Sequence, residues 1–547
     1  MQRNILLSLS LGLALGVAVT ADQAAAQCAN QSSGPDVIVG DVSGCATYGT
    51  ASGFSGYALG TTSCNIGNAQ LLWISNNTQH PVIGQNIYRL NDGRFEQIGQ
   101  SWLKHGFTAL QQNLCCPCQS SGTGSRLGVG CSDPYGSSLN GSQSGLGPRS
   151  EVNAFTGAFL YPFGSQGQTG NAAYKRAQVL RDDVDPANFP NALYFGEAQY
   201  VAPDDAAAGN GLNNVSWRRL NRPGAQTSGS FTLSTTGSTV RMQPAVMAWK
   251  AQDPTVDVQI VDVPGEGRFW VASNCYQGQG GTFRYEYVVF NLNSHRSACR
   301  LTIPIGAGAT ILNEGMSWPR SHSGEPYDNS PWTMQNLGDR ILFTTDSFAT
   351  DPNANAIRWG TMYSFWFEST NAPEAKTATI TLFRPGVEPD PTVSVCGPVG
   401  GTPVPVVSNY CNAVINSTGV TGTITAQNID MNARTMELAG ANLPTNAFAF
   451  SLASLTQGFV ANPGNSTGNI CLGGNIGRVV GGNILNTGAT GSLVEAVNLD
   501  QMPTPSGISV PVGAGEAWYF QFWHRDVIVG LNLPTSNFTN GVRVWFP

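Results

Sequence analysis

Four residues in the N-terminal part of the chain have side chains suited to acid–base chemistry: His80, Glu96, Lys104 and His105. Histidine is scarce, with five copies in 547 residues. Two imidazoles on neighbouring strands can hold a metal ion together with a carboxylate such as Glu96 or Asp133, and they can transfer protons. These four residues are the catalytic candidates if the protein is an enzyme. The alternative is that both histidines only cap local structure.

A second cluster contains His322, Glu325, Tyr327 and Asp328, which fall within seven residues that also include a glycine and a proline. Glycine and proline favour a loop, so the four polar side chains can point outward together. Such a loop is a candidate ligand-binding site for a cation, for sugar hydroxyls or for a protein partner. The alternative is a turn held by hydrogen bonds between side chains and backbone.

Calcium is the only cofactor that the sequence suggests. Asp351, Asn353 and Asn355 place oxygen-bearing side chains at alternate positions, and calcium takes six to eight oxygen ligands. The bidentate glutamate expected further along such a loop is missing. These three residues form the candidate metal site.

One strand near the C-terminus carries aromatic side chains on both of its faces. Trp518, Phe520 and Phe522 alternate on the face that also holds His524, whereas Tyr519 and Trp523 occupy the other face. The pattern indicates either a strand buried on both sides or an exposed aromatic platform. Aromatic platforms of this kind stack on sugar rings or anchor protein interfaces.

Twelve cysteines follow the first 26 residues, and an even count favours disulfides in an oxidising compartment. We expect Cys275 to pair with Cys299 and Cys411 to pair with Cys471. The run Cys115-Cys116-Pro117-Cys118 resembles a metal cluster, but adjacent cysteines suit a single zinc ion poorly. Disulfides are therefore preferred throughout.

Strand signals dominate the elements that must position these groups. Alternating apolar and polar residues recur in short runs, and clusters of Gly, Asn, Pro and Ser separate them. We predict an all-β fold of tandem β-sandwich-like domains with long disulfide-tethered loops. In the hairpin closed by Asp92-Gly93, Arg89 should face Glu96 and Ile87 should face Ile98. A short helix is expected over 101–112.

Composition excludes several classes of function. Charged residues make up 11% of the chain and the net charge is -7, which leaves too few clustered cations for nucleic acid as a partner. Hydrophobic residues reach 41%, so the chain can build cores and is not expected to be disordered.

The order of segments indicates export and a modular plan. Residues 1–26 combine Arg3, an uncharged apolar run and a small-residue cleavage site, as a secretory signal peptide does. No transmembrane segment is expected in the mature chain. We predict, in chain order, an N-terminal β-rich domain with a Gly/Ser-rich loop (27–200), a middle β-sandwich (201–390), a Pro-rich linker (391–410) and a C-terminal β-sandwich (411–547).

Several stretches resemble an uncharacterised family of large secreted, modular all-β proteins of aquatic bacteria. HPVIGQNIYRLNDGRFEQIGQSWLKHGF (80–107) is similar to their N-terminal region, and RYEYVVFNLNSHRSA and HSGEPYDNSPW are similar to their middle region. GNICLGG, QMPTPSG and FQFWHRD resemble a C-terminal β domain that these proteins share. The resemblance implies secretion and an all-β fold, but no reaction. Related middle regions carry Asp where this chain has His295, which argues against His295 as a ligand.

Two functions follow from these patterns. The first is a secreted extracellular or cell-surface binding or structural protein, with glycan recognition or attachment as its role. The alternative is a secreted enzyme that degrades an extracellular polysaccharide with a site in the N-terminal region. Clustered histidines and a carboxylate in one cleft would favour the enzyme.

Overall fold

The computed structural model describes residues 31–106, 108–278, 282–401, 405–479, 484–513 and 515–546. The expected signal peptide and Cys28 lie outside the described residues. About half of the chain is strand and 6% is helix, so the all-β prediction is confirmed. In the part that the structure describes, no helix has the length and hydropathy needed to cross a membrane.

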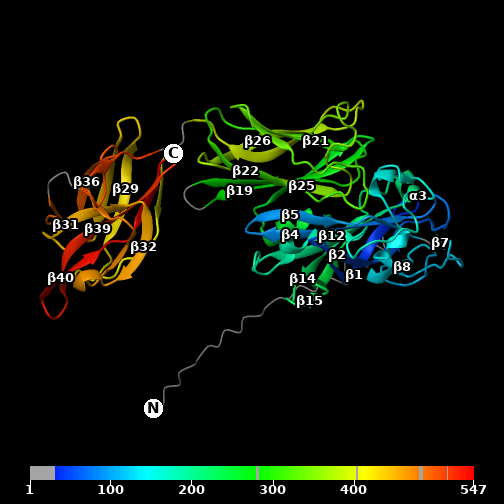
Figure 1. The fold of residues 1–547 in the computed structure, drawn as a ribbon, viewed down its shortest axis with the longest axis horizontal. Helices are drawn as coiled ribbons and strands as arrows, with labels where there is room; N and C mark the ends of the chain where they lie inside the picture. Colours follow the sequence, from blue (N-terminus) through cyan, green and yellow to red (C-terminus); the bar gives the residue numbers. More distant parts are fainter. Residues whose placement is uncertain are drawn as a thin grey trace, which may run out of the picture.

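The N-terminal unit (31–240) is built on one large antiparallel sheet that curls so that β1 also contacts β14 and β17 (Figure 1). The strands in order across the sheet are β1 (Val37–Ala51), β2 (Phe54–Asn65), β12 (Ala177–Leu180), β5 (Arg94–Gln100), β4 (Val82–Asn91), β13 (Leu193–Val201), β14 (Val215–Asn221) and β17 (Ser234–Val240). Shorter strands and helices at its ends are β6 (Leu103–His105), β8 (Ser132–Tyr135), β9 (Leu146–Gly147), α2 (Ser137–Asn140), η3 (Arg181–Val184) and α3 (Pro203–Ala207).

The middle unit (257–401) is a sandwich of two five-stranded antiparallel sheets. One sheet contains β18 (Asp257–Val263), β19 (Gly267–Gln277), β20 (Phe283–Asn291), β25 (Thr361–Ser369) and β22 (Ile311–Ser317). The other contains β23 (Thr333–Asn336), β24 (Arg340–Thr344), β21 (Ala298–Pro304), β26 (Pro373–Leu382) and β27 (Thr392–Pro398). Alternate residues such as Tyr285, Tyr287 and Val289 fill the core between the sheets.

The C-terminal unit (405–546) is a second sandwich with its own core. Its larger sheet contains β28 (Val406–Asn409), β41 (Val542–Trp545), β39 (Ala517–Ile528), β31 (Phe448–Ser454) and β34 (Gly477–Arg478), with β35 (Leu485–Asn486) and β40 (Leu533–Phe538) at the side. Its smaller sheet contains β29 (Thr423–Asp430), β30 (Thr435–Ala441) and β36 (Leu493–Asn498). The hairpin of β32 (Thr456–Ala461) and β33 (Asn469–Gly473) packs beside β39.

The first two units share a hydrophobic core at their junction. The helix α4 (Val246–Gln252) contributes Trp249, which stacks on Phe95 of β5 with the ring centroids 6.4 Å apart. Phe290 of β20 and Met362 of β25 belong to the same cluster. The last strand of the N-terminal sheet, β17, ends at Val240. The boundary between the first two units thus lies near residue 240, and not near residue 200 as predicted.

The Pro-rich segment is mostly strand. Residues 392–398 form β27 in the middle unit and residues 406–409 form β28 in the C-terminal unit. The connection between strands is thus confined to 399–405, much shorter than the predicted 391–410. Among the described prolines of this segment, Pro398 lies in a strand, at the end of β27, and an edge strand such as β27 tolerates it.

The Asp92-Gly93 hairpin forms with the predicted pairing near its turn, including Arg89 opposite Glu96. A bulge then shifts the register, so that Ile87 faces Gly99 and not Ile98. The prediction of a short helix over 101–112 is wrong. Residues 103–105 form β6 because they pair with β4, so tertiary strand pairing decides the local structure.

Disulfides join Cys64 to Cys115, Cys118 to Cys131, Cys275 to Cys396 and Cys411 to Cys471. The last pair confirms a prediction, whereas the expected Cys275–Cys299 bond is wrong. Cys275 instead joins β19 to β27 of the facing sheet, and Cys299 is buried with a free thiol. Cys45 is also free, so the expectation that all cysteines pair fails at these two positions.

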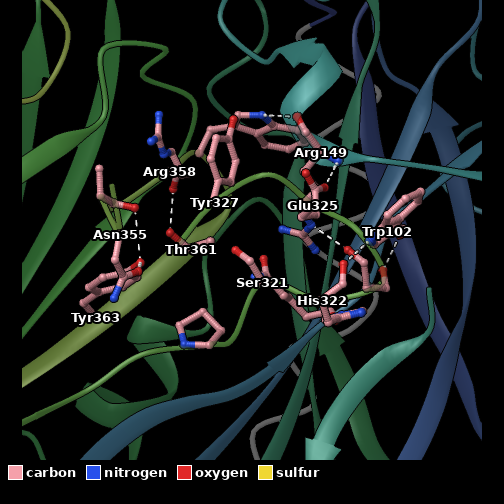
Figure 2. A pocket seen from close by; sticks show the side chains of 15 residues that line it. Trp102, Arg149, Ser321, His322, Glu325, Tyr327, Asn355, Arg358, Thr361 and Tyr363 are labelled. Carbon is pink, nitrogen blue, oxygen red and sulfur yellow. Dashed lines mark hydrogen bonds between the residues drawn. The ribbon is translucent and has the colours of Figure 1, made fainter. Parts of the chain in front are cut away.

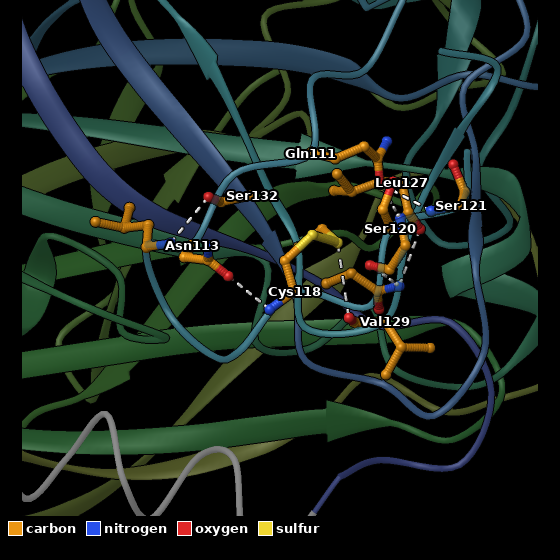
Figure 3. The surroundings of a disulfide bond; sticks show 12 residues. Gln111, Asn113, Cys118, Ser120, Ser121, Leu127, Val129 and Ser132 are labelled. Carbon is orange, nitrogen blue, oxygen red and sulfur yellow. Dashed lines mark hydrogen bonds between the residues drawn. A yellow bond between two sulfur atoms is a disulfide. The ribbon is translucent and has the colours of Figure 1, made fainter. Parts of the chain in front are cut away.

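The Cys118–Cys131 bond closes the start of the Gly/Ser-rich loop (Figure 3). Around it, the Cys118 N–H donates to Asn113 Oδ1 over 2.7 Å. Gln111 Oε1 accepts from the N–H groups of Ser121 and Gly128. A covalent bond and side-chain amides therefore order a segment that has too few apolar side chains to pack.

Candidate functional site

The structure brings His80, Lys104 and His105 together in a buried position. His80 Nε2 and His105 Nδ1 are 2.9 Å apart, and His80 Nδ1 lies 3.0 Å from the carbonyl oxygen of Ile74. Because that carbonyl only accepts, neutral His80 donates from Nδ1 and accepts from His105 at Nε2. The two rings are almost fully buried, and the His105 ring stacks on Phe163.

Burial shifts the pKa values of these groups toward their neutral forms. Burial, together with His80 and Lys104, lowers the pKa of His105 to about 2. Burial also lowers the pKa of Lys104 to about 8. Glu96 lies elsewhere, in an ion pair with Arg89, and Asp133 accepts from the Leu110 N–H. Among the described residues, no three His, Cys, Asp or Glu side chains gather as a metal site would require.

The second predicted cluster forms a strap, residues 321–325, that ties the middle unit to the N-terminal unit (Figure 2). His322 Nε2 donates to the carbonyl of Gln100 over 2.8 Å, and Trp102 Nε1 donates to the carbonyl of His322 over 3.0 Å. The carboxylate of Glu325 accepts from the backbone N–H groups of Arg149 and Ser150. The hydrogen bonds of His322 and Glu325 are thus directed into the molecule.

Tyr327 and Asp328 also have internal partners. The guanidinium carbon of Arg358 lies 4.0 Å from the centroid of the Tyr327 ring. Asp328 Oδ1 accepts from the N–H groups of Asn329 and Ser330, as in a local turn. The four predicted ligand-binding residues are near one another, but each makes hydrogen bonds or ring contacts within the chain.

The pocket behind the strap is lined by His322, Glu325 and Tyr327 (Figure 2). Arg149 crosses it, with its guanidinium donating to the carbonyls of Gln85, Ser101 and Gly360. The free volume is about 20 Å³, enough for a single water molecule. This pocket is a packed junction between two units, and it has no room for a sugar or nucleotide.

The candidate calcium residues make other contacts. Asp351 Oδ1 accepts from the N–H of Asn353 over 2.8 Å. Asn355 is buried, with its Oδ1 accepting from the hydroxyl of Tyr363 over 2.5 Å and its Nδ2 donating to the carbonyl of Ser330. Calcium needs several oxygens that converge and are free, and the Asn355 side-chain oxygen already accepts from Tyr363.

A larger groove lies on the other side of the same segment. It has a volume of about 250 Å³ and is lined by residues of both units. From the N-terminal unit come Phe54, Arg89, Glu96, Gln97, Ile98, Gln178, Leu180 and Asp183. From the middle unit come Met316, Ser317, Trp318, Arg320 and Trp366. Residues just before the strap therefore form one wall of the groove.

An ion-pair network forms one end of this groove. Arg89 Nη2 is 2.6 Å from Glu96 Oε2, and Arg89 Nη1 is 2.8 Å from Asp183 Oδ1. Burial acts to lower the pKa of Arg89, but the two carboxylates outweigh burial and raise it. Burial raises the pKa of Asp183, and Arg89 only partly offsets that effect. One cation between two carboxylates leaves a net negative charge at this end.

The other wall is aromatic and cationic. The indole N–H of Trp318 is buried and has no hydrogen-bond partner. Arg320 is exposed, and its guanidinium carbon lies 5.7 Å from the Trp318 ring centroid. One face of the Trp366 ring is covered by Arg94, at 3.5 Å from its guanidinium carbon to the ring centroid. The groove thus combines aromatic ring surface with charged side chains, of which Arg320 is exposed.

Sequence reasoning found only Glu96 among the residues of this groove. Trp318 and Arg320 immediately precede the predicted cluster at His322. The sequence therefore pointed to the correct segment, but the predicted residues face the small pocket and not the groove. Asp183 reaches the groove only because β12 pairs with β5, which no local pattern reveals. A comparison with protein families finds none that matches this chain, and a comparison with curated proteins finds no match either.

Proposed function

We propose that this chain is a secreted extracellular or cell-surface protein that binds a glycan in the groove between its first two units. The observation that carries the proposal is the lining of that groove. It joins the rings of Phe54, Trp318 and Trp366 to the charged groups of Arg89 and Arg320. Sugar rings bind through such pairs, because their C–H faces pack on aromatic side chains and their hydroxyls take directional hydrogen bonds.

The size of the groove limits the ligand. Small-molecule pockets span roughly 300–1,000 Å³, and this groove holds about 250 Å³. It suits one sugar unit of a chain whose neighbouring units extend into solvent. The exposed guanidinium of Arg320, beside the Trp318 ring, gives a donor for that unit.

Export is the second part of the proposal. Its support is the predicted signal peptide, the four described disulfides and the resemblance to large secreted bacterial proteins. Disulfides of this number persist in an oxidising compartment and are rare in a reducing cytosol.

A glycan array probed with the full mature chain tests the binding function. Arg320→Gln removes one exposed donor from the groove and should weaken the strongest signals at least tenfold. Arg340→Gln is the matched control, because Arg340 is an exposed arginine on β24 that pairs with Asp339. Silence across diverse glycans contradicts the proposal, and so does an equal loss in both variants.

A second function has one specific observation in its favour. Glu96 and Asp183 both contact Arg89 in the same groove, and paired carboxylates are the machinery of polysaccharide hydrolysis. The catalytic roles would then belong to Glu96 and Asp183, with His80, Lys104 and His105 outside the site. Release of reducing sugar ends by the wild type, abolished in Glu96→Gln while binding persists, would establish the enzyme in place of the binding protein.

A further inference from the structure

The outer face of the large sheet in the C-terminal unit carries a strip of four stacked side chains. Arg478 lies over Phe450, with 4.4 Å between the guanidinium carbon and the ring centroid. The Phe450 and Trp523 rings stack with centroids 4.5 Å apart and planes at 18°. Arg525 follows, 5.4 Å from the Trp523 ring centroid.

Strand register places all four on one face. Phe450 of β31 is paired with Trp523 of β39, and Leu452 of β31 is paired with Arg478 of β34. Paired residues in an antiparallel sheet share a face, and so do residues two apart on a strand. Trp518, Phe520 and Phe522 therefore point the opposite way, and they are buried in the core.

The middle of the outer face is covered, whereas the rings of Phe450 and Trp523 are partly buried against the cluster of Leu452, Leu472 and Phe538. The β32–β33 hairpin covers Gln521, whose amide bonds the backbone of Asn469 and Cys471. Arg478 and Arg525 are exposed at the two ends of the strip. The strand β39 was predicted to be either buried on both faces or an exposed aromatic platform. It is buried on one face and partly open on the other.

Neither end of the strip is neutralised by a carboxylate. Within the described residues, no ion pair involves Arg478 or Arg525, although Arg434 on the other side of the unit pairs with Asp500. Asp526 follows Arg525 in sequence, but its side chain is buried and accepts from the Ser417 N–H. The strip keeps two uncompensated positive charges.

The rings between the arginines add to the positive field. The Phe450 and Trp523 rings are partly exposed, and the edge of an aromatic ring carries partial positive charge. Stacking also holds each guanidinium in place, so less conformational entropy is lost when it binds an anion. A ligand that bridges both ends must carry negative charges in a repeating arrangement.

We propose that the Arg478–Arg525 strip binds an acidic polysaccharide, one whose sugar units carry carboxylate or sulfate groups. The two guanidiniums take anionic groups on separate units, and the ring edges between them contact the polymer. Repulsion from a chain of net charge -7 disfavours polyanions in general, so binding depends on this local strip. The site is separate from the groove and does not depend on the glycan proposed there.

Binding of the full mature chain to immobilised dextran sulfate, with uncharged dextran as the matched polymer, tests the strip. A second arm with alginate separates sulfate from carboxylate recognition. At about 150 mM salt, the double variant Arg478→Gln/Arg525→Gln should bind the preferred polymer roughly tenfold more weakly than the wild type. Arg434→Gln removes one positive charge elsewhere on the unit, and its affinity for the polymer should stay within about twofold of the wild type.

Several outcomes overturn the proposal. They are no binding to either acidic polymer, equal weakening in Arg434→Gln, and unchanged binding in the double variant. Tighter binding to single-stranded DNA than to both polysaccharides also contradicts it. Both substitutions replace exposed side chains, and circular dichroism establishes that each variant is folded. The groove variant Arg320→Gln should keep its affinity for the polymer, so failure here and failure of the groove are told apart.

Discussion

At the scale of single residues, burial decides what the candidate groups can do. His105 and His322 are surrounded by protein, and their pKa values fall to about 2 and about 4 because burial disfavours the charged ring. Arg149 is also buried, and it donates to three backbone carbonyls that come from distant parts of the chain. These side chains hold the fold, whereas the Arg320 guanidinium is exposed at the groove.

The histidine of the strap, His322, predicts a specific loss of stability in acid. The unfolded chain binds a proton at His322 below about pH 6.5, while the folded protein does not bind it until about pH 4. Stability therefore falls as the pH drops from 6.5 to 4, by up to about 3 kcal/mol from this residue. Urea unfolding at pH 7 and pH 4.5 should show a smaller loss in His322→Gln. Equal pH dependence in both proteins would contradict this.

At the scale of elements, short connections between sheets hold the strands in place. The strap at 321–325 bonds the last residue of β5 and the start of the short helix η2 (Arg149–Glu151), which precedes β10 (Val152–Asn153). In the middle unit, the Cys275–Cys396 bond crosses from one sheet of the sandwich to the other. Both connections bring together residues that are more than 100 positions apart in sequence.

Removal of the inter-sheet disulfide should destabilise the middle unit. The bond closes a loop with a sequence separation of 121, and a loop of that length corresponds to about 3–5 kcal/mol. Cys275→Ser/Cys396→Ser should unfold at correspondingly lower denaturant concentration. Cys299→Ser is the control, because its thiol is free and buried. A thiol-mapping experiment in denaturant should label Cys45 and Cys299 and leave Cys275 unlabelled; labelled Cys275 would refute the pairing.

At the scale of the whole molecule, the hydrophobic clusters divide the chain into two parts. The junction cluster joins residues of the N-terminal and middle units, including Tyr88, Trp249 and Phe290. The C-terminal sandwich has a separate core. Among the hydrophobic clusters of the described residues, none combines side chains from before residue 401 with side chains from after residue 405.

This division predicts two thermal transitions. The first two units should unfold together and the C-terminal unit separately. Trp249→Ala opens a cavity in the junction core and should cost about 3–5 kcal/mol. In calorimetry of this variant, the larger transition, from the first two units, should move to lower temperature, while the smaller transition, from the C-terminal unit, should stay unchanged. Leu438→Ala, in the core of the C-terminal unit, should do the reverse. A single transition, or shifts of both transitions in either variant, would contradict it.

The sequence by itself determined the class of fold and some local pairings. Alternation of apolar and polar residues is a local property, so strands such as β20 and β25 could be recognised without any partner. The Asp92-Gly93 turn specified that Arg89 faces Glu96, because two-residue hairpins fix the register beside them. Cys411 and Cys471 are the two cysteines of the predicted C-terminal domain (411–547), which allowed their bond to be predicted.

Only the tertiary structure decided which polar groups are free to act. His322 and Glu325 carry suitable chemistry in a suitable loop, yet they bond backbone groups of another unit. The groove forms because β12 pairs with β5 and because the middle unit packs beside both. Contacts between residues far apart in sequence determine burial and partners, and burial and partners determine whether a side chain is available to a ligand.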